Sequence, residues 1–230
     1  MYKGINVVIV CLSILLFFCS CNNDTTKKSE PVNTSEPKTT APPAIAKKTI
    51  LLFGDSLTAG YGLEQEEAYS VLLQQKIDAL QLPYTCINAG ISGDTTAGGL
   101  GRIDWVLKQP AAIFLLELGA NDGLRGISTE ETEKNLRAII DKVREKSSDT
   151  KIILAGMKVP PNMGENYAVK YEAIFPRVAK EKEVDLIPFF LKGIAGNPEL
   201  NQPDRIHPTA EGAKILAETV WEALETYVKP

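Results

Sequence analysis

The chain contains one histidine, His207, so any histidine-based chemistry must use this side chain. It lies in the sequence Asp204-Arg205-Ile206-His207-Pro208. An aspartate three residues before a histidine can turn back to accept the imidazole Nδ1–H, which fixes the tautomer and stabilises the imidazolium. We therefore predict that His207 is a general base and that Asp204 orients it. A turn that precedes a helix and carries a surface histidine is the simpler alternative.

Ser56 is the candidate nucleophile. The sequence Gly54-Asp55-Ser56 directly follows the apolar run 49–53. A serine on a tight turn at the end of a buried strand points its Oγ atom into the adjoining cleft, and its own N–H points the same way. The Gly-x-Ser-x-Gly motif is absent from the chain. A serine that only caps a helix is the alternative here.

Two further loops offer hydrogen-bond donors. Gly93 lies in a loop after the apolar run 84–88, and a glycine lets the backbone N–H approach a substrate closely. Asn121 follows the run 111–118 and carries a side-chain amide. The N–H groups of Ser56 and Gly93 and the Asn121 amide could together stabilise an oxyanion. Each loop alone would be an ordinary turn, but the combination predicts acyl transfer on a serine.

The elements that must position these residues alternate along the chain. Short apolar runs predict strands at 49–53, 84–88, 111–118, 151–157 and 184–188. Amphipathic stretches predict helices at 67–80, 95–108, 129–146, 166–182 and 209–227. This alternation predicts an α/β fold with a parallel sheet between two helix layers. Ligands of such sheets bind beyond the carboxyl ends of the strands, which is where the candidate residues fall.

These motifs resemble the SGNH/GDSL hydrolase superfamily, whose four letters correspond to Ser56, Gly93, Asn121 and His207. Within it, the sequence is most similar to the bacterial multifunctional acyl-CoA thioesterase I, lysophospholipase and arylesterase group. The resemblance implies a flavodoxin-like three-layer α/β/α sandwich with five parallel strands. It also implies hydrolysis of carboxylic esters, and of thioesters, through an acyl-enzyme and without a cofactor.

Two other functions stay open at this stage. A carbohydrate O-acetyl esterase of the same superfamily would share the triad and differ in the walls of its cleft. The Gly123-Leu124-Arg125-Gly126 extension favours the thioesterase and lysophospholipase group instead. A ligand-binding lipoprotein without catalysis would be expected to lack a member of the triad, and none is missing.

The N-terminus predicts export and anchoring. Lys3 precedes an apolar run at 5–18, and Phe18-Cys19-Ser20-Cys21 resembles a bacterial lipobox, with Phe where Leu or Val is commoner. We predict a signal peptide at 1–20, a lipid on Cys21, a disordered tether to residue 48 and a hydrolase domain at 49–230. The protein would then be a membrane-anchored lipoprotein of the cell envelope, facing the periplasm or the exterior. An ordinary signal peptide and a soluble periplasmic protein are the alternative.

The amino-acid composition limits the kinds of partner that the protein could bind. The net charge of −4 argues against binding to a nucleic-acid backbone. Of the four cysteines, only Cys86 would remain unmodified in the mature chain, so we expect no intramolecular disulfide. A single histidine also argues against a zinc site. The expected partners are an acyl ester substrate and, through the anchor, a membrane; we expect a monomer.

Overall fold

The computed structural model describes residues 46–229. The predicted signal peptide, Cys21 and nearly all of the predicted tether lie outside these residues.

The described part of the chain forms one five-stranded sheet with the order β2-β1-β3-β4-β5. All four strand pairings are parallel. The strands are β1 (Lys48–Gly54), β2 (Tyr84–Gly90), β3 (Ile113–Glu117), β4 (Lys151–Ala155) and β5 (Asp185–Ile187). The order reverses between β1 and β3, which makes the carboxyl ends of these two strands the place where a ligand is expected. The predicted flavodoxin-like fold is confirmed.

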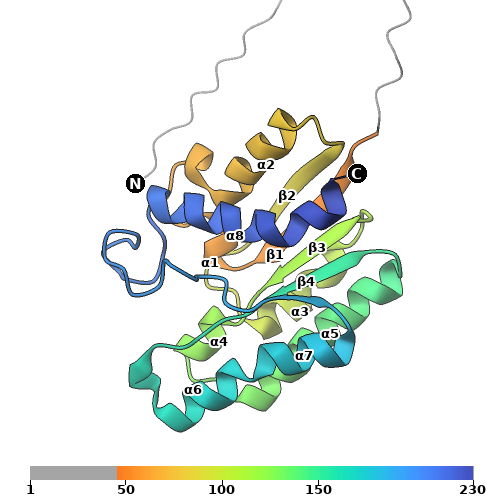
Figure 1. Cartoon of the computed structure of the whole chain (residues 1–230). Coiled ribbons are helices and arrows are strands. Elements are labelled where there is room, and N and C mark those ends of the chain that lie inside the picture. The colour runs from red at the N-terminus through yellow and green to blue at the C-terminus, as the bar shows by residue number, and fades with distance from the viewer. Residues whose placement is uncertain (1–45, 230) are drawn as a thin grey trace, which may run out of the picture. The chain divides into compact units, whose positions relative to one another are not determined.

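Two helix layers cover the sheet, as Figure 1 shows. The helices α2 (Tyr69–Ala79) and α8 (Ala210–Val228) pack together on one face. The other face carries α3 (Thr96–Val106), α5 (Thr129–Lys146), α6 (Glu165–Glu172) and α7 (Ile174–Lys182). Short helices α1 (Ser56–Ala59) and α4 (Ala120–Leu124) follow β1 and β3, and the 3₁₀ turns Gln65–Glu67 and Pro161–Met163 complete the elements. Among residues 46–229, no helix is long and apolar enough to cross a membrane.

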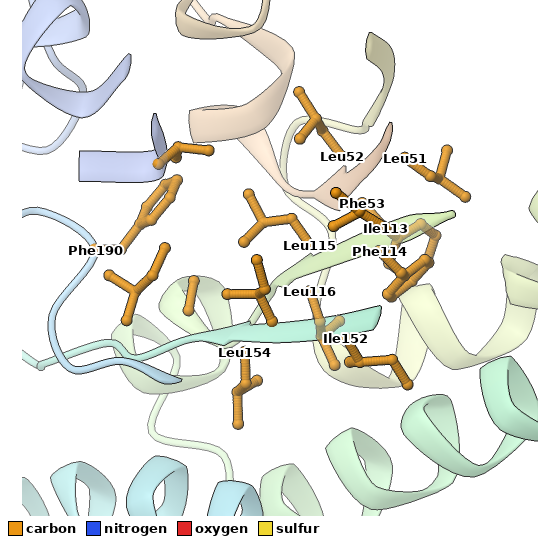
Figure 2. Packing of buried hydrophobic residues seen from close by; sticks show 14 of the residues in the cluster. Leu51, Leu52, Phe53, Ile113, Phe114, Leu115, Leu116, Ile152, Leu154 and Phe190 are labelled. Atoms are coloured by element: carbon orange, nitrogen blue, oxygen red, sulfur yellow. The ribbon is translucent and has the colours of Figure 1, made fainter. Parts of the chain in front are cut away.

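The core lies on both faces of the central strands. Every residue of β3 is buried, and so are the last five residues of β1. Figure 2 shows side chains of these strands packed with Ile152 and Leu154 of β4 and with Phe190. A continuous apolar run buried on both sides is typical of a central parallel strand. This packing gives the loops at the carboxyl edge a rigid base.

The structure differs from the expected helices in two places. The stretch 166–182 forms two helices that meet at Ala173, because Pro176 has no N–H and its ring crowds the carbonyl of Glu172. The short helices α1 and α4 were not predicted, since four or five residues are too few to show a helical period. Both lie next to the candidate site.

Candidate active site

Ser56 is the first residue of α1, on the turn that follows β1. The helix is capped by Asp55, whose Oδ1 atom accepts the Leu57 N–H at 3.0 Å. Ser56 is therefore not the capping residue, and its side chain is left for other contacts. Gly54 is required at the end of β1, because an added Cβ atom would lie within 2.3 Å of Thr58 Oγ1 and of Glu117 Oε2. This tight turn leaves Ser56 8% exposed.

His207 lies beside Ser56. Its Nε2 atom is 2.9 Å from Ser56 Oγ, and its Nδ1 atom is 2.6 Å from Asp204 Oδ2. The other oxygen of Asp204 accepts the N–H groups of Ile206 and His207 at 2.9 and 3.0 Å. Arg205 adopts a left-handed backbone conformation with φ of 62°, which tightens the turn between the aspartate and the histidine. The three side chains predicted as a triad are thus in a continuous hydrogen-bonded series.

The electrostatics of Asp204 suit an ionised partner for His207. Burial alone would raise its pKa, but the hydrogen bonds from the His207 ring and from two backbone N–H groups outweigh this effect. The pKa of Asp204 is therefore held below its usual value, and the carboxylate stays charged at neutral pH.

Tyr61 is a neighbour of His207 that sequence reasoning did not single out. Its ring centroid lies 4.6 Å from that of His207, and the two planes are inclined by 41°. A cavity of about 10 Å³ adjoins Ser56, His207 and Tyr61, and Leu57 and Leu216 also line it. A cavity of this size has room for about one water molecule. An acyl chain would accordingly have to lie on the open surface rather than in this cavity.

Gly93 lies in the loop between β2 and α3, at the same edge of the sheet. Its φ of +81° is a conformation that favours glycine. Arg125, at the end of α4, donates from Nη2 to the Gly93 carbonyl at 2.9 Å and so holds this peptide. Among residues 46–229, neither the Ser56 N–H nor the Gly93 N–H donates a hydrogen bond within the protein. Both N–H groups are available to a substrate oxygen.

Asn121 joins the two loops. Its Nδ2 atom donates to Asp55 Oδ2 at 3.1 Å and to the carbonyl of Asp94 at 3.0 Å. The amide thus contacts the residue before Ser56 and the residue after Gly93. In this structure both of its N–H groups already have acceptors within the protein. A substrate oxygen would have to share or take over one of them.

Two carboxyl groups behind the nucleophile turn were missed by sequence reasoning. Burial raises the pKa of Asp55 to about 6, although hydrogen bonds from Leu57 and Asn121 oppose the rise. Glu117, at the end of β3, is completely buried, and burial together with the nearby Asp55 raises its pKa well above the usual value. In the sequence, Glu117 is marked only as an acidic residue near the end of the apolar run 111–118.

A serine hydroxyl that contacts an imidazole, next to unused backbone N–H groups, is suited to nucleophilic attack on a carbonyl carbon. Residues 52–215 match the model of the GDSL-like Lipase/Acylhydrolase family. The chain belongs to this family.

Individual members of the GDSL-like family support the same assignment. Esterase TesA of Pseudomonas aeruginosa is 37% identical over 78% of the chain and 89% of its own length. Thioesterase 1/protease 1/lysophospholipase L1 of Escherichia coli is 38% identical over 80% of the chain and 87% of its own length. The crystal structure of esterase EstA from Pseudoalteromonas sp. has a TM-score of 0.75, with 36% identity over 80% of the chain and all of EstA. The predicted superfamily and the expectation of a carboxylic ester hydrolase are confirmed.

Proposed function

We propose that the protein hydrolyses carboxylic esters and thioesters through a covalent acyl-enzyme on Ser56. The observation that carries this proposal is the series of hydrogen bonds from Asp204 through His207 to Ser56 Oγ. This contact supports His207, the only histidine of the chain, as the general base.

In the first step, Ser56 Oγ attacks the acyl carbonyl carbon while His207 Nε2 takes the hydroxyl proton. Asp204 holds the ring through Nδ1 and stabilises the imidazolium. His207 then gives the proton to the leaving alcohol or thiol. Water then attacks the acyl-enzyme while His207 takes its proton. Breakdown of the intermediate releases the carboxylic acid, and His207 returns the proton to Ser56 Oγ.

The oxyanion that forms in both steps needs donors at the carboxyl edge of the sheet. The unused N–H groups of Ser56 and Gly93 supply two of them in this proposal. The Asn121 amide supplies the third, and of its two present acceptors the neutral carbonyl of Asp94 is the weaker. A charged oxyanion would therefore take this N–H more easily than the one held by Asp55.

The substrates that we propose are aryl esters, acyl-CoA thioesters and lysophospholipids. The names of the relatives from P. aeruginosa and E. coli include esterase, thioesterase and lysophospholipase. Rates with p-nitrophenyl butyrate, palmitoyl-CoA, lysophosphatidylcholine and acetylated xylan would rank these classes. A clear preference for acetylated xylan would favour the carbohydrate esterase instead.

The Ser56→Ala variant tests the proposal. It should lose hydrolysis of p-nitrophenyl butyrate to near the uncatalysed rate, because the other groups only assist the nucleophile. Ser92→Ala removes an exposed hydroxyl one residue from Gly93 and serves as the matched control, which should stay active. A Ser56→Ala protein with wild-type activity would disprove the role of this serine.

We further propose that the protein is a monomer held at a membrane by a lipid on Cys21, after removal of residues 1–20. The lipobox-like sequence Phe18-Cys19-Ser20-Cys21 supports the anchor. Cys21→Ser should abolish incorporation of radiolabelled palmitate and release activity from the membrane fraction. Wild-type activity in the soluble fraction, with no incorporation of labelled palmitate, would favour the soluble periplasmic alternative. Light scattering measures the molar mass of the purified domain and so tests whether it is a monomer.

A further inference from the structure

Asp55 and Glu117 are buried carboxyl groups that the proposed mechanism does not use. Both side chains are completely buried. Asp55 directly follows β1 and Glu117 ends the neighbouring strand β3, where it is in register with Gly54. Asp55 lies in the turn that carries Ser56, and Glu117 ends the strand that leads to Asn121.

The two groups have different hydrogen bonds. Both oxygens of Asp55 accept a donor: Oδ1 from the Leu57 N–H at 3.0 Å and Oδ2 from Asn121 Nδ2 at 3.1 Å. Glu117 uses only one oxygen, since Oε2 accepts from Thr58 Oγ1 at 2.6 Å and from the Asp55 N–H at 3.2 Å. The other oxygen, Oε1, has no partner in the described part of the chain.

This difference indicates which member of the pair carries the negative charge. An unpartnered oxygen of a buried carboxylate is far more costly than an unpartnered oxygen of a neutral acid. Glu117 Oε2 lies 3.2 Å from the backbone nitrogen of Asp55, and two neighbouring buried carboxylates repel each other, so one of them keeps its proton. Glu117, with its orphan oxygen, is the better site for the proton, and Asp55, with both oxygens bonded, is the better carboxylate.

The side chains around Asp55 and Glu117 are consistent with a single negative charge on the pair. The titratable and charged side chains that face the pair are Asp94 from the loop after β2, His207 from the loop before α8, Tyr69 from α2 and Tyr171 from α6. Arg102 of α3 bonds to Asp94 Oδ2 at 2.7 Å and to the Gly54 carbonyl at 3.0 Å. The positive charge of Arg102 is therefore already paired with Asp94. No hydrogen bond joins the Arg102 guanidinium to Glu117.

We propose that Asp55 and Glu117 are a positioning pair, in which a charged Asp55 orients the Asn121 amide and an uncharged Glu117 holds the backbone of the nucleophile turn. The inference rests on the proposed acyl transfer at Ser56. Neither group touches the substrate. Asp55 acts through Asn121, whose plane it sets, and Glu117 acts through the Asp55 N–H and Thr58, which fix the start of α1.

Kinetics with p-nitrophenyl butyrate test the pair. A parallel titration with a fluorophosphonate counts the reactive sites, so that kcat refers to the folded fraction of each protein. Asp55→Asn removes the charge and should lower kcat roughly 10–100-fold, the loss typical of one charge-assisted hydrogen bond, with little change in KM. In an Asn121→Ala background the same substitution should cost less than about 3-fold in kcat, because residues that act through one another are not additive.

Glu117 is tested by two substitutions. Glu117→Leu should lower kcat about 10-fold or more, because the Asp55 N–H and the Thr58 hydroxyl lose their acceptor. Glu117→Gln keeps a carbonyl oxygen and no charge, so it should recover most of that loss. Glu133→Gln is the matched control. Glu133 is a buried carboxyl on α5 that pairs with Arg137 and Arg177, away from the site. The kcat of this variant should stay at the wild-type value.

Three results would overturn the inference: a wild-type kcat in Asp55→Asn, additive losses with Asn121→Ala, or equal kcat in Glu117→Gln and Glu117→Leu. Failure of the proposed function is distinguishable, because Ser56→Ala would then remain active or the wild type would not be labelled.

Discussion

The Nε2 atom of His207 lies 2.9 Å from the Oγ atom of Ser56, although 151 positions separate the two residues. The contact depends on the parallel sheet, which brings the turn after β1 and the loop before α8 to the same edge. Asp204 holds the ring from the other side at 2.6 Å. The relative positions of these three groups are therefore set by the sheet and by one four-residue turn.

Replacing Asn121 with alanine should leave an impaired but measurable enzyme. Loss of one oxyanion donor typically costs about 2.7–4 kcal/mol of transition-state stabilisation, or roughly 10²–10³ in kcat. KM for p-nitrophenyl butyrate should change little, because the oxyanion forms only in the transition state. Asn135→Ala removes a buried asparagine on α5 and should keep its kcat. An Asn121→Ala enzyme with the wild-type kcat would exclude the amide as a donor.

Asp204→Asn should lower kcat while the protein stays folded. The neutral amide cannot stabilise the imidazolium and favours the wrong tautomer, an effect worth about 10⁴ in a fully buried triad. We expect a smaller loss of roughly 10²–10³ here, because the Asp204 side chain is 36% exposed and water can replace part of the interaction. Glu211→Gln, an exposed carboxyl of α8, is the control. Equal kcat values in Asp204→Asn and the wild type would remove Asp204 from the mechanism.

The pH dependence of stability should report the buried Asp55. Its pKa of about 6 in the folded protein exceeds the ordinary value of 3.8, so the folded state binds this proton more tightly than the unfolded state. The stability that Asp55 contributes is complete below about pH 4 and is lost as the pH rises through 6. A rise of this size corresponds to up to about 3 kcal/mol.

Urea unfolding of the wild type and of Asp55→Asn from pH 4 to pH 8 measures this effect. Relative to the variant, the wild type should lose free energy of unfolding as the pH increases, because only the wild type must ionise Asp55. The carboxyl groups other than Asp55 are present in both proteins, so the difference isolates Asp55 and its coupling to Glu117. A difference between the two that does not vary with pH would show that Asp55 titrates normally.

The dependence on acyl length should be shallow. The cavity beside Ser56 is about 10 Å³, so a long chain would remain on the surface. Complete burial of a methylene group contributes about 0.8 kcal/mol, which is roughly 4-fold in kcat/KM. Each added methylene in p-nitrophenyl esters should therefore raise kcat/KM by less than this factor. A steeper increase would reveal a deep acyl pocket that opens on binding.

Much of this arrangement could be predicted from the sequence. The alternation of apolar runs and amphipathic stretches indicated the parallel sheet, and the single histidine left only one partner for Ser56. Gly93 and Asn121 were found because they follow strands whose carboxyl ends meet at one edge.

Other features depend on contacts that no local pattern reports. The Arg125 bond to the Gly93 carbonyl joins two loops, and the burial of Glu117 against Gly54 depends on the strand register. The contact between the Tyr61 and His207 rings is equally non-local. The break at Ala173 is different, because Pro176 lies in the sequence itself and its ring crowds the carbonyl four residues earlier.

The most direct test is to treat the protein with a fluorophosphonate and measure the mass of its peptides. EstA, one of the similar esterases of known structure, was crystallised in a form inhibited by monoethylphosphonate. We predict one adduct per chain, on the peptide that contains Ser56, with loss of p-nitrophenyl butyrate hydrolysis in proportion to labelling. No adduct should form on Ser56→Ala. An unlabelled Ser56 in an active enzyme, or inactivation with the adduct on another residue, would contradict the assignment.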